Sequence, residues 1–235
     1  MKKKALITGI TGMVGSHLAD LLLKKKNWNV VGVCRWRSPI DNIKHLISAS
    51  EKKNSRIKID YADLNDYSSL LKIINKHKPD YIFHLAAQSF PKASFDMPNV
   101  TFDTNISGTY RLLDTVVKSN LNPVIHVCSS SEVFGRVSKE KLPINEDCSF
   151  HPASPYAISK VGTDLIGRFF FEAYNLKILT TRMFTHTGPR RTDFFAESSF
   201  AKQIAMIENN KNNNTVYVGN LKSLRTIADV RDAVR

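Results

Sequence analysis

Short apolar runs alternate along the chain with segments in which apolar residues recur every three or four positions. The runs predict strands at Lys4–Thr8, Val30–Cys34, Arg56–Tyr61, Tyr81–Leu85, Val124–Ser129 and Ile178–Met183. The periodic segments predict helices at His17–Lys26, Ser68–Lys78, Thr101–Ser119 and Pro155–Tyr174. A repeated strand–helix–strand pattern indicates an α/β protein with a doubly wound parallel sheet, whose ligands bind at the carboxyl ends of the strands.

Two connectors, Arg136–Pro152 and Pro189–Ser198, are longer than most loops between strands and helices, which is typical of functional loops. The Asn- and Lys-rich stretch Asn209–Thr215 predicts a surface turn. The residues Ile227–Arg235 begin a helical pattern and stop within it, so we expect a truncated chain that lacks part of a second domain.

Bulk composition is that of a folded, soluble protein, with 235 residues of which 42% are hydrophobic and 23% charged. Polar residues from Thr8 onward interrupt the first apolar stretch too early for a signal peptide, and no window approaches the roughly 18 apolar residues of a membrane span. Three scattered cysteines favour neither a disulfide framework nor a zinc site. We therefore expect a cytoplasmic protein with no membrane association and no metal.

The formal net charge of +13 raises the question of nucleic-acid binding. The lysines are dispersed, however, and no basic run is interleaved with aromatic residues. A solvated lysine-rich surface with no nucleic-acid partner is the favoured interpretation, and its positive field would help to hold ligands that carry phosphates.

A glycine-rich turn follows the first predicted strand and leads into the first helix, with the sequence Thr8-Gly9-Ile10-Thr11-Gly12-Met13-Val14-Gly15. Gly9 allows a tight turn, Gly12 lets a pyrophosphate approach the backbone, and Gly15 lets the helix pack closely. The helix N-terminus offers free N–H groups to phosphate. Because strand and helix flank the turn as required, we predict a Rossmann-type dinucleotide site that includes Gly9, Thr11, Gly12, Met13 and Val14.

The second strand ends in a segment with two arginines, where an NAD-selective site would have an acidic residue. Arg35 and Arg37, with Ser38, suit a ribose 2′-phosphate, so NADP is expected rather than NAD. The alternative is that one or both arginines are solvated surface charges.

Two further loops are expected at the same edge of the sheet. Asp63 could accept a hydrogen bond from an adenine amino group, beside Leu64, although a helix cap is an equally good interpretation of Asp63. Leu85, Ala86 and Ala87 would let the chain pass close to the cofactor, although small residues also serve plain packing.

Tyr156 and Lys160 lie four residues apart in a predicted helix, so their side chains share one face. A neighbouring ammonium favours the phenolate, which makes Tyr156 a usable base near neutral pH. Such a pair is common by chance and gains weight only from the glycine turn.

The strand Val124–Ser129 is followed by Ser130 and Glu132 at the same edge. Ser130 could hydrogen-bond a reacting hydroxyl of the substrate. Simple hydride transfer needs only the Ser/Tyr/Lys set, whereas elimination of water needs a further acid/base, and Glu132 is the candidate. A helix cap or a salt bridge is the alternative role for Glu132.

Together these residues resemble the extended short-chain dehydrogenase/reductase family and, within it, the GDP-mannose 4,6-dehydratases. The resemblance rests on segments found in order along the whole chain: Gly9–Val14, Leu85–Ser89, Ser94–Asp96, Gly108-Thr109, Ser131-Glu132, Ser154–Ala157, His186 with Pro189-Arg190-Arg191, and Gly219–Leu221 with Arg225.

The resemblance implies a Rossmann domain over residues 1–183 and the beginning of a smaller substrate-binding domain over 184–235. It also implies that His186 and Arg191 contact NADP, that Arg225 contacts the nucleotide diphosphate, and that Ser89 and Thr185 lie on the substrate side. The family has threonine at Ser130, which keeps the hydroxyl. It has asparagine at Thr185, which leaves GDP-mannose or a GDP-manno-heptose as the substrate.

The implied activity is oxidation at C4 by Tyr156 and NADP, loss of water across C5 and C6 through Glu132, and return of the hydride to C6. A 4-epimerase, a reductase or a uronic acid decarboxylase remains an alternative, as does a non-catalytic NADP-binding fragment. The resemblance further implies a homodimer or homotetramer that pairs the helices Thr101–Ser119 and Pro155–Tyr174.

Overall fold

The computed structural model describes residues 2–209, 214–222 and 224–235, and a parallel sheet of six strands organises them. The strand order is β3-β2-β1-β4-β5-β6, with every pairing parallel. The strands are β1 (Lys3–Thr8), β2 (Trp28–Cys34), β3 (Ile57–Tyr61), β4 (Tyr81–His84), β5 (Val124–Cys128) and β6 (Lys177–Thr181). This arrangement confirms the predicted doubly wound α/β sheet.

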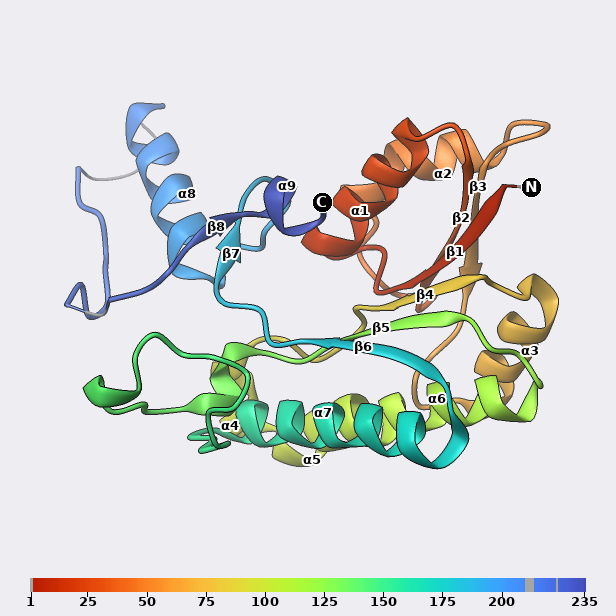
Figure 1. The fold of residues 1–235 in the computed structure, drawn as a ribbon. Coiled ribbons are helices and arrows are strands. Elements are labelled where there is room, and N and C mark those ends of the chain that lie inside the picture. Colours follow the sequence, from red (N-terminus) through yellow and green to blue (C-terminus); the bar gives the residue numbers. More distant parts are fainter. Residues whose placement is uncertain (1, 210–213, 223) are drawn as a thin grey trace.

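Helices cover both faces of the sheet (Figure 1). One face carries α1 (Met13–Lys24) and α2 (Lys44–Ser50), and the other carries α3 (Tyr67–His77), α6 (Gly108–Lys118) and α7 (Pro155–Tyr174). The short helices α4 (Pro91–Asp96) and α5 (Pro98–Phe102) lead into α6. Helix α8 (Ala196–Glu208) lies away from the sheet.

The alternation of side chains along each strand builds the two apolar layers of the core. Leu6 of β1 packs in the layer beneath α3, α6 and α7, whereas its neighbours Ala5 and Ile7 pack in the layer beneath α1 and α2. All three side chains are almost fully buried. Burial on both faces explains why the strands are continuous apolar runs in the sequence.

Several element boundaries differ from the sequence-based expectations. The predicted helix Thr101–Ser119 is not uniform, because a π-helical turn, Asp103–Ser107, separates α5 from α6. Helices α2, α4 and α8 were not predicted, and α8 begins within the expected connector Pro189–Ser198. Helix α8 has no buried residue. The predicted turn Asn209–Thr215 falls largely outside the described residues.

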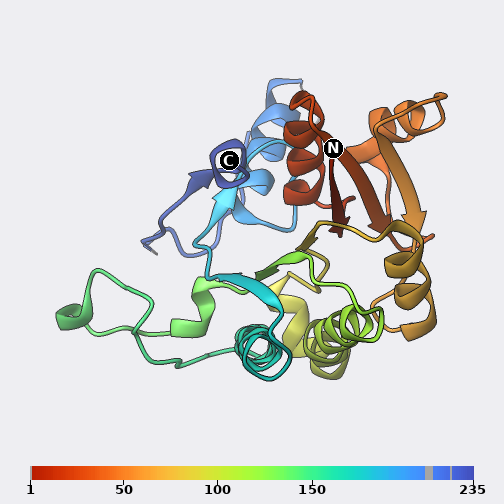
Figure 2. The ribbon, with the colours of Figure 1, turned by 45° about the vertical axis from the view of Figure 1, so that its right-hand side comes forward.

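After β6 the chain leaves the six-stranded sheet and crosses to the side of the molecule that carries α1. Strands β7 (His186–Thr187) and β8 (Ala228–Asp229) pair in parallel, and α9 (Val230–Ala233) follows. Helix α9 packs against α1, as Figures 1 and 2 both show, with Val230 fully buried. The helix expected within Ile227–Arg235 is therefore present, while the domain boundary at residue 183 stays a prediction. In the described part of the chain, no helix is long and apolar enough to cross a membrane.

Candidate active site

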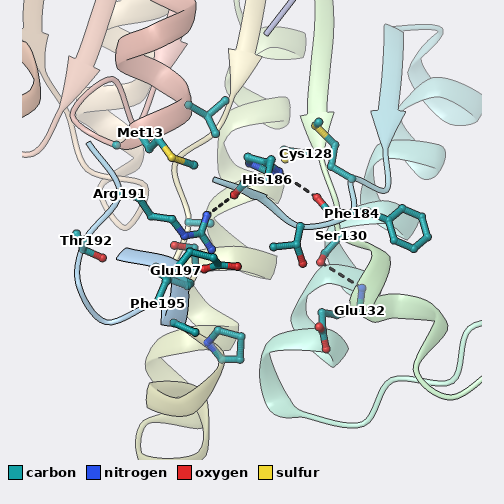
Figure 3. A pocket seen from close by; sticks show the side chains of 18 of the residues that line it. Met13, Cys128, Ser130, Glu132, Phe184, His186, Arg191, Thr192, Phe195 and Glu197 are labelled. Atoms are coloured by element: carbon teal, nitrogen blue, oxygen red, sulfur yellow. Dashed lines mark hydrogen bonds between the residues drawn. The ribbon is translucent and has the colours of Figure 1, made fainter. Parts of the chain in front are cut away.

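A cleft of about 1180 Å³ opens at the carboxyl ends of β1, β4 and β5. Figure 3 shows Ser130 and Glu132 on one side of it and Arg191, Phe195 and Glu197 on the other. The predicted site residues that line the cleft are Gly9, Thr11, Gly12, Met13, Val14, Leu85, Ala87, Ser89, Ser130, Glu132, Tyr156, Lys160, Thr185, His186, Arg191 and Arg225. The fold thus gathers most of the predicted site into one cavity.

The glycine turn forms the floor of the cleft between β1 and α1. Gly9 has a φ of +71°, and a Cβ there would stand 2.8 Å from the backbone of Ala86. A Cβ on Gly15 would stand 2.8 Å from the Cα of Ile10, so this glycine packs α1 against the turn itself. Gly12 is the N-cap of α1 and offers no side-chain cap, which leaves N–H groups of the first helical turn available to an anion. These features fit a dinucleotide pyrophosphate.

A buried polar chain fixes the loop after β4 beside the turn. The Thr8 hydroxyl accepts hydrogen bonds from the N–H groups of Leu85 (3.1 Å) and Ala86 (3.2 Å), so it donates to His84 Nδ1 (2.9 Å). His84 Nε2 then donates to Thr109 Oγ1 at 3.0 Å. Burial, with the nearby Lys160 and His126, lowers the pKa of His84 to about 3. A neutral imidazole with its proton on Nε2 is therefore the form that this network requires.

Tyr156 and Lys160 lie at the start of α7. Ser154 caps the helix by accepting from the N–H of Ala157 at 3.0 Å, and the buried Ser94 hydroxyl accepts from the N–H of Tyr156 at 3.0 Å. Lys160 Nζ lies 5.9 Å from the centroid of the Tyr156 ring and donates to the carbonyl of Cys128 at 2.7 Å. The ammonium is thus held beside the phenol, as the spacing predicted.

Ser130 and Glu132 follow β5 in a short 3-10 helix, Ser131–Phe134. The Ser130 hydroxyl, rather than Glu132, caps this helix by accepting from the Glu132 N–H at 3.2 Å. The Glu132 carboxylate extends into the cleft with 44% of its side chain exposed, and Arg225 Nη1 lies 3.6 Å from it. Both sequence-based roles for Glu132 remain compatible with this position, because an exposed ion pair of that length is weak.

Arg191 and His186 form the opposite wall. Arg191 Nη1 donates to the His186 carbonyl at 2.6 Å, and its guanidinium lies 3.8 Å from the centroid of Phe195. Its buried Nε has no protein partner. Burial lowers the pKa of both Arg191 and His186. A cation with an unpartnered buried N–H is suited to an anionic ligand.

Six predicted cofactor residues do not line the cleft. Arg35, Arg37 and Ser38 lie in an exposed turn after β2, where the Arg37 guanidinium stacks 4.4 Å from the Trp36 ring centroid. Asp63 Oδ1 accepts from the N–H of Asn65 at 3.0 Å, so Asp63 stabilises its own loop. The remaining two, Leu64 and Ala86, pack in or against the apolar core. Cofactor contacts by these six residues stay a prediction.

Sequence reasoning missed other residues of the cleft, among them Asn42, Cys128, Phe195, Glu197 and Phe200. The spacing of Phe200, Ile204 and Ile207 was a helical signal that could have placed α8 and hence Phe200 and Glu197. No local signal identifies Asn42. Among the residues that the structure describes, no cluster of three potential metal-binding side chains occurs.

Fold and site together define a class, the extended short-chain dehydrogenase/reductase proteins with a Rossmann domain. RMD from Pseudomonas aeruginosa, solved with NADPH, superimposes with a TM-score of 0.82 at 27% identity, over 99% of this chain and 71% of that one. A UDP-glucuronic acid 4-epimerase from Bacillus cereus, solved with UDP-glucuronic acid and NAD, gives a TM-score of 0.84 at 26% identity, over 98% and 70%.

Within that class, the chain belongs to the GDP-mannose 4,6-dehydratase family, whose model matches residues 6–235. The Drosophila melanogaster GDP-mannose 4,6-dehydratase is 39% identical over 99% of this chain and 59% of its own length. A Caenorhabditis elegans relative, GDP-mannose 4,6-dehydratase 2, is 35% identical over 99% and 62%. The chain thus spans about three fifths of the length of these curated relatives.

Proposed function

We propose that this protein is a nucleotide-sugar 4,6-dehydratase that converts GDP-mannose, or a GDP-manno-heptose, to the GDP-linked 4-keto-6-deoxy sugar. The observation that carries the proposal is the position of Glu132. Its carboxylate shares one cleft with Ser130 and with the Tyr156–Lys160 pair. A carboxylate there adds to the hydride-transfer set the acid/base group that elimination of water requires. Membership of the dehydratase family supports the same assignment.

The proposed cofactor is NADP, with NAD as the alternative. The glycine turn and the N-terminus of α1 would hold the pyrophosphate, and Arg191 and His186 would contact the cofactor from the opposite wall. Arg35, Arg37 and Ser38 are free to meet a 2′-phosphate because the turn that carries them is exposed. One solved neighbour has NADPH and another has NAD, so the arginines are the reason for preferring NADP.

The side chains divide the reaction between oxidation and elimination. Tyr156 removes the proton of the C4 hydroxyl, and the Lys160 ammonium beside it favours the phenolate. Ser130 hydrogen-bonds the same sugar hydroxyl. Bound NADP would supply the acceptor for the C4 hydride and the source of the hydride at C6, and C5 would then take up a proton from solvent. Glu132 removes the C5 proton, which the 4-keto group acidifies, and returns a proton to the departing C6 hydroxyl.

The remaining contacts concern the nucleotide. Arg225, which precedes β8, lines the cleft and would contact the diphosphate. For this contact to form, its weak ion pair with Glu132 must break. Ser89 and Thr185 line the cleft beside the proposed sugar position. Binding of the diphosphate by Arg225 would therefore free the Glu132 carboxylate for its role in elimination.

We also propose a cytoplasmic homodimer or homotetramer. The outward faces of α6 and α7 expose large apolar side chains that a solvated helix pair does not need. These are Tyr110, Ile158, Leu165 and Phe169, each between 45% and 47% exposed.

The deciding experiment incubates the purified chain with catalytic NADP and either GDP-mannose or GDP-manno-heptose, and follows the sugar nucleotide by mass spectrometry. Loss of one water from one of the two substrates is expected. The Glu132→Gln variant keeps the shape of the side chain but removes the base, so it should abolish the loss of water while retaining NADP binding.

Tyr156→Phe provides the matched control for the first step. It should prevent solvent exchange at C5 as well as dehydration, because no 4-keto group forms, whereas Glu132→Gln should still permit hydride transfer. Intact sugars with wild-type protein that demonstrably binds NADP would rule out the proposed activity for this chain.

A further inference from the structure

The segment Pro189–Arg191 runs from the wall of the cleft to helix α1. His17 Nε2 donates to the Pro189 carbonyl at 3.2 Å. The Arg190 guanidinium lies 2.7 Å from Asp20 Oδ2, and both His17 and Asp20 belong to α1. The segment Pro189–Arg191 is therefore bound to α1, the helix whose N-terminus would hold the cofactor pyrophosphate.

Asn42 fastens the same segment to the glycine turn. Its side-chain amide donates one hydrogen bond to the Thr11 carbonyl at 2.9 Å and one to the Arg190 carbonyl at 3.1 Å. All three residues line the cleft. Both amide hydrogens are used, so Asn42 links the glycine turn, which would hold a pyrophosphate, to the segment Pro189–Arg191.

Asp20 joins three separate elements. One carboxylate oxygen pairs with Arg190, and the other lies 2.8 Å from His45 Nε2 of α2. Although partial burial opposes ionisation, the hydrogen bond from His45 and the positive charge of Arg190 hold the pKa of Asp20 below its ordinary value. The carboxylate is therefore charged at neutral pH, and about a quarter of the side chain is exposed.

The backbone of the segment adopts a strained conformation at Arg190. Arg190 has a φ of +72°, in the left-handed region that a long side chain rarely adopts. This conformation lets successive arginines point apart: Arg190 toward Asp20, and Arg191 to Phe195 in the cleft. The contacts of Arg190 thus offset the strain that this conformation carries.

We propose that Asp20 and Asn42 are positioning residues that latch the Pro189–Arg191 segment over the dinucleotide cleft, aim Arg191 at the cofactor and slow cofactor release. The inference rests on the proposed nicotinamide cofactor but not on the sugar or on elimination. A latch suits a reaction that restores its cofactor in every cycle, since exchange is then unnecessary. Release requires the Asp20–Arg190 and Asn42–Arg190 contacts to break.

The test measures NADPH binding and release by stopped-flow fluorescence with the wild-type chain and the Asp20→Asn variant. Loss of the ionic anchor is expected to raise the dissociation rate about tenfold, with a smaller change in the association rate. The matched control is Asp193→Asn, which removes an exposed ion pair between Asp193 and Lys202 of α8. Its dissociation rate should equal that of the wild type.

Two further variants separate latching from general stability. The exchange Asp20→Arg with Arg190→Asp restores the ion pair but not the contact with His45, so it should recover part of the slow release. Asn42→Ala removes only the amide bridge and should accelerate release even if Asp20→Asn fails to fold.

Release rates that match the wild type in Asn42→Ala, or in a folded Asp20→Asn variant, would overturn the latch. Wild-type protein that binds neither NADPH nor NADH would overturn the proposed cofactor and the latch together. Slow release and its loss in the variants, combined with intact sugars, would leave the latch standing and reject only the dehydratase activity.

Discussion

At the scale of single residues, two positions around the glycine turn show how closely backbone and side chains are matched. Gly9 combines a positive φ with close contact to the backbone of Ala86, so neither the torsion nor the space admits a side chain. His84 fills the adjacent buried position as a neutral hydrogen-bond relay between Thr8 and Thr109. Each residue joins β1 to β4 at the edge where the cleft opens.

Substitution Gly9→Ala should lower the free energy of unfolding by at least about 2 kcal/mol, because strain at positive φ and the clash with Ala86 act together. It should also abolish NADPH binding. The checks are urea unfolding and fluorescence titration. Gly219→Ala is the control, since a Cβ there meets nothing within 4 Å, and equal effects of the two substitutions would contradict the prediction.

The pH dependence of stability follows from His84. Burial lowers its pKa from 6.5 to about 3, so the unfolded chain takes up a proton below pH 6.5 that the folded protein does not. The free energy of unfolding should therefore fall as the pH drops from about 6.5 toward 3, with His84 responsible for about 2 kcal/mol at pH 5. Burial of His126 acts in the same direction, with a pKa of about 4.

Urea unfolding between pH 7 and pH 5 checks this dependence. His84→Gln should make the dependence less steep and leave the contribution of His126. A pH dependence in His84→Gln as steep as in the wild type would show that another group is responsible.

At the scale of elements, Arg182 joins helix α7 to the connector Arg136–Pro152. Its guanidinium makes hydrogen bonds of 2.8 and 3.2 Å to the buried Asp164 of α7 and one of 2.8 Å to the Glu146 carbonyl. It also lies 4.8 Å from the ring centroid of Phe150 in the connector. Because Asp164 follows Lys160 by one helical turn, the face of α7 that carries the Tyr156–Lys160 pair also anchors this loop.

Substitution Asp164→Asn should lower the free energy of unfolding by about 3 kcal/mol, because it leaves the Arg182 cation largely buried without its counter-charge. Urea unfolding measures the loss, and limited proteolysis should show faster cleavage within the connector. Asp193→Asn breaks an exposed pair and should leave the unfolding midpoint nearly unchanged. Unaltered proteolysis of the connector in Asp164→Asn would argue against the anchor.

At the scale of the whole molecule, the outward face of α7 leaves several large apolar side chains exposed in the single chain. Ile158, Leu165 and Phe169 recur at spacings of seven and four and so lie along one side of the helix. Tyr110 of α6 is similarly exposed. Pairing of this face with a second copy would bury it.

Phe169→Glu should convert the proposed oligomer to a monomer, because a carboxylate would have to be buried in the interface. Analytical ultracentrifugation at several concentrations measures the change. Leu142→Glu alters an equally exposed apolar residue of the connector and should leave the assembly intact. A wild-type chain that remains monomeric at all concentrations would reject the proposed oligomer.

Much of the fold could be predicted from the sequence because its signals are local. Strand runs, helical periodicity and the glycine turn each depend on residues a few positions apart, and α7 was predicted with its observed bounds, Pro155–Tyr174. Helix α8 was missed although Phe200, Ile204 and Ile207 are spaced for a helix, and the π-helical turn Asp103–Ser107 was missed because it interrupts a segment whose periodicity is that of one helix. There, Asn105 bonds the backbone of Gln88 and the hydroxyl of Ser159.

The candidate site divides in the same way. The sequence by itself determined that Tyr156 and Lys160 share a helical face and that Ser130 and Glu132 follow a strand, because spacing and periodicity settle both. Only the tertiary structure decided that Asn42 meets Arg190, 148 residues away, and that His17 meets Pro189 across 172 residues. Such contacts have no periodic signature, since they arise from how folded elements pack rather than from the neighbours of each residue along the chain.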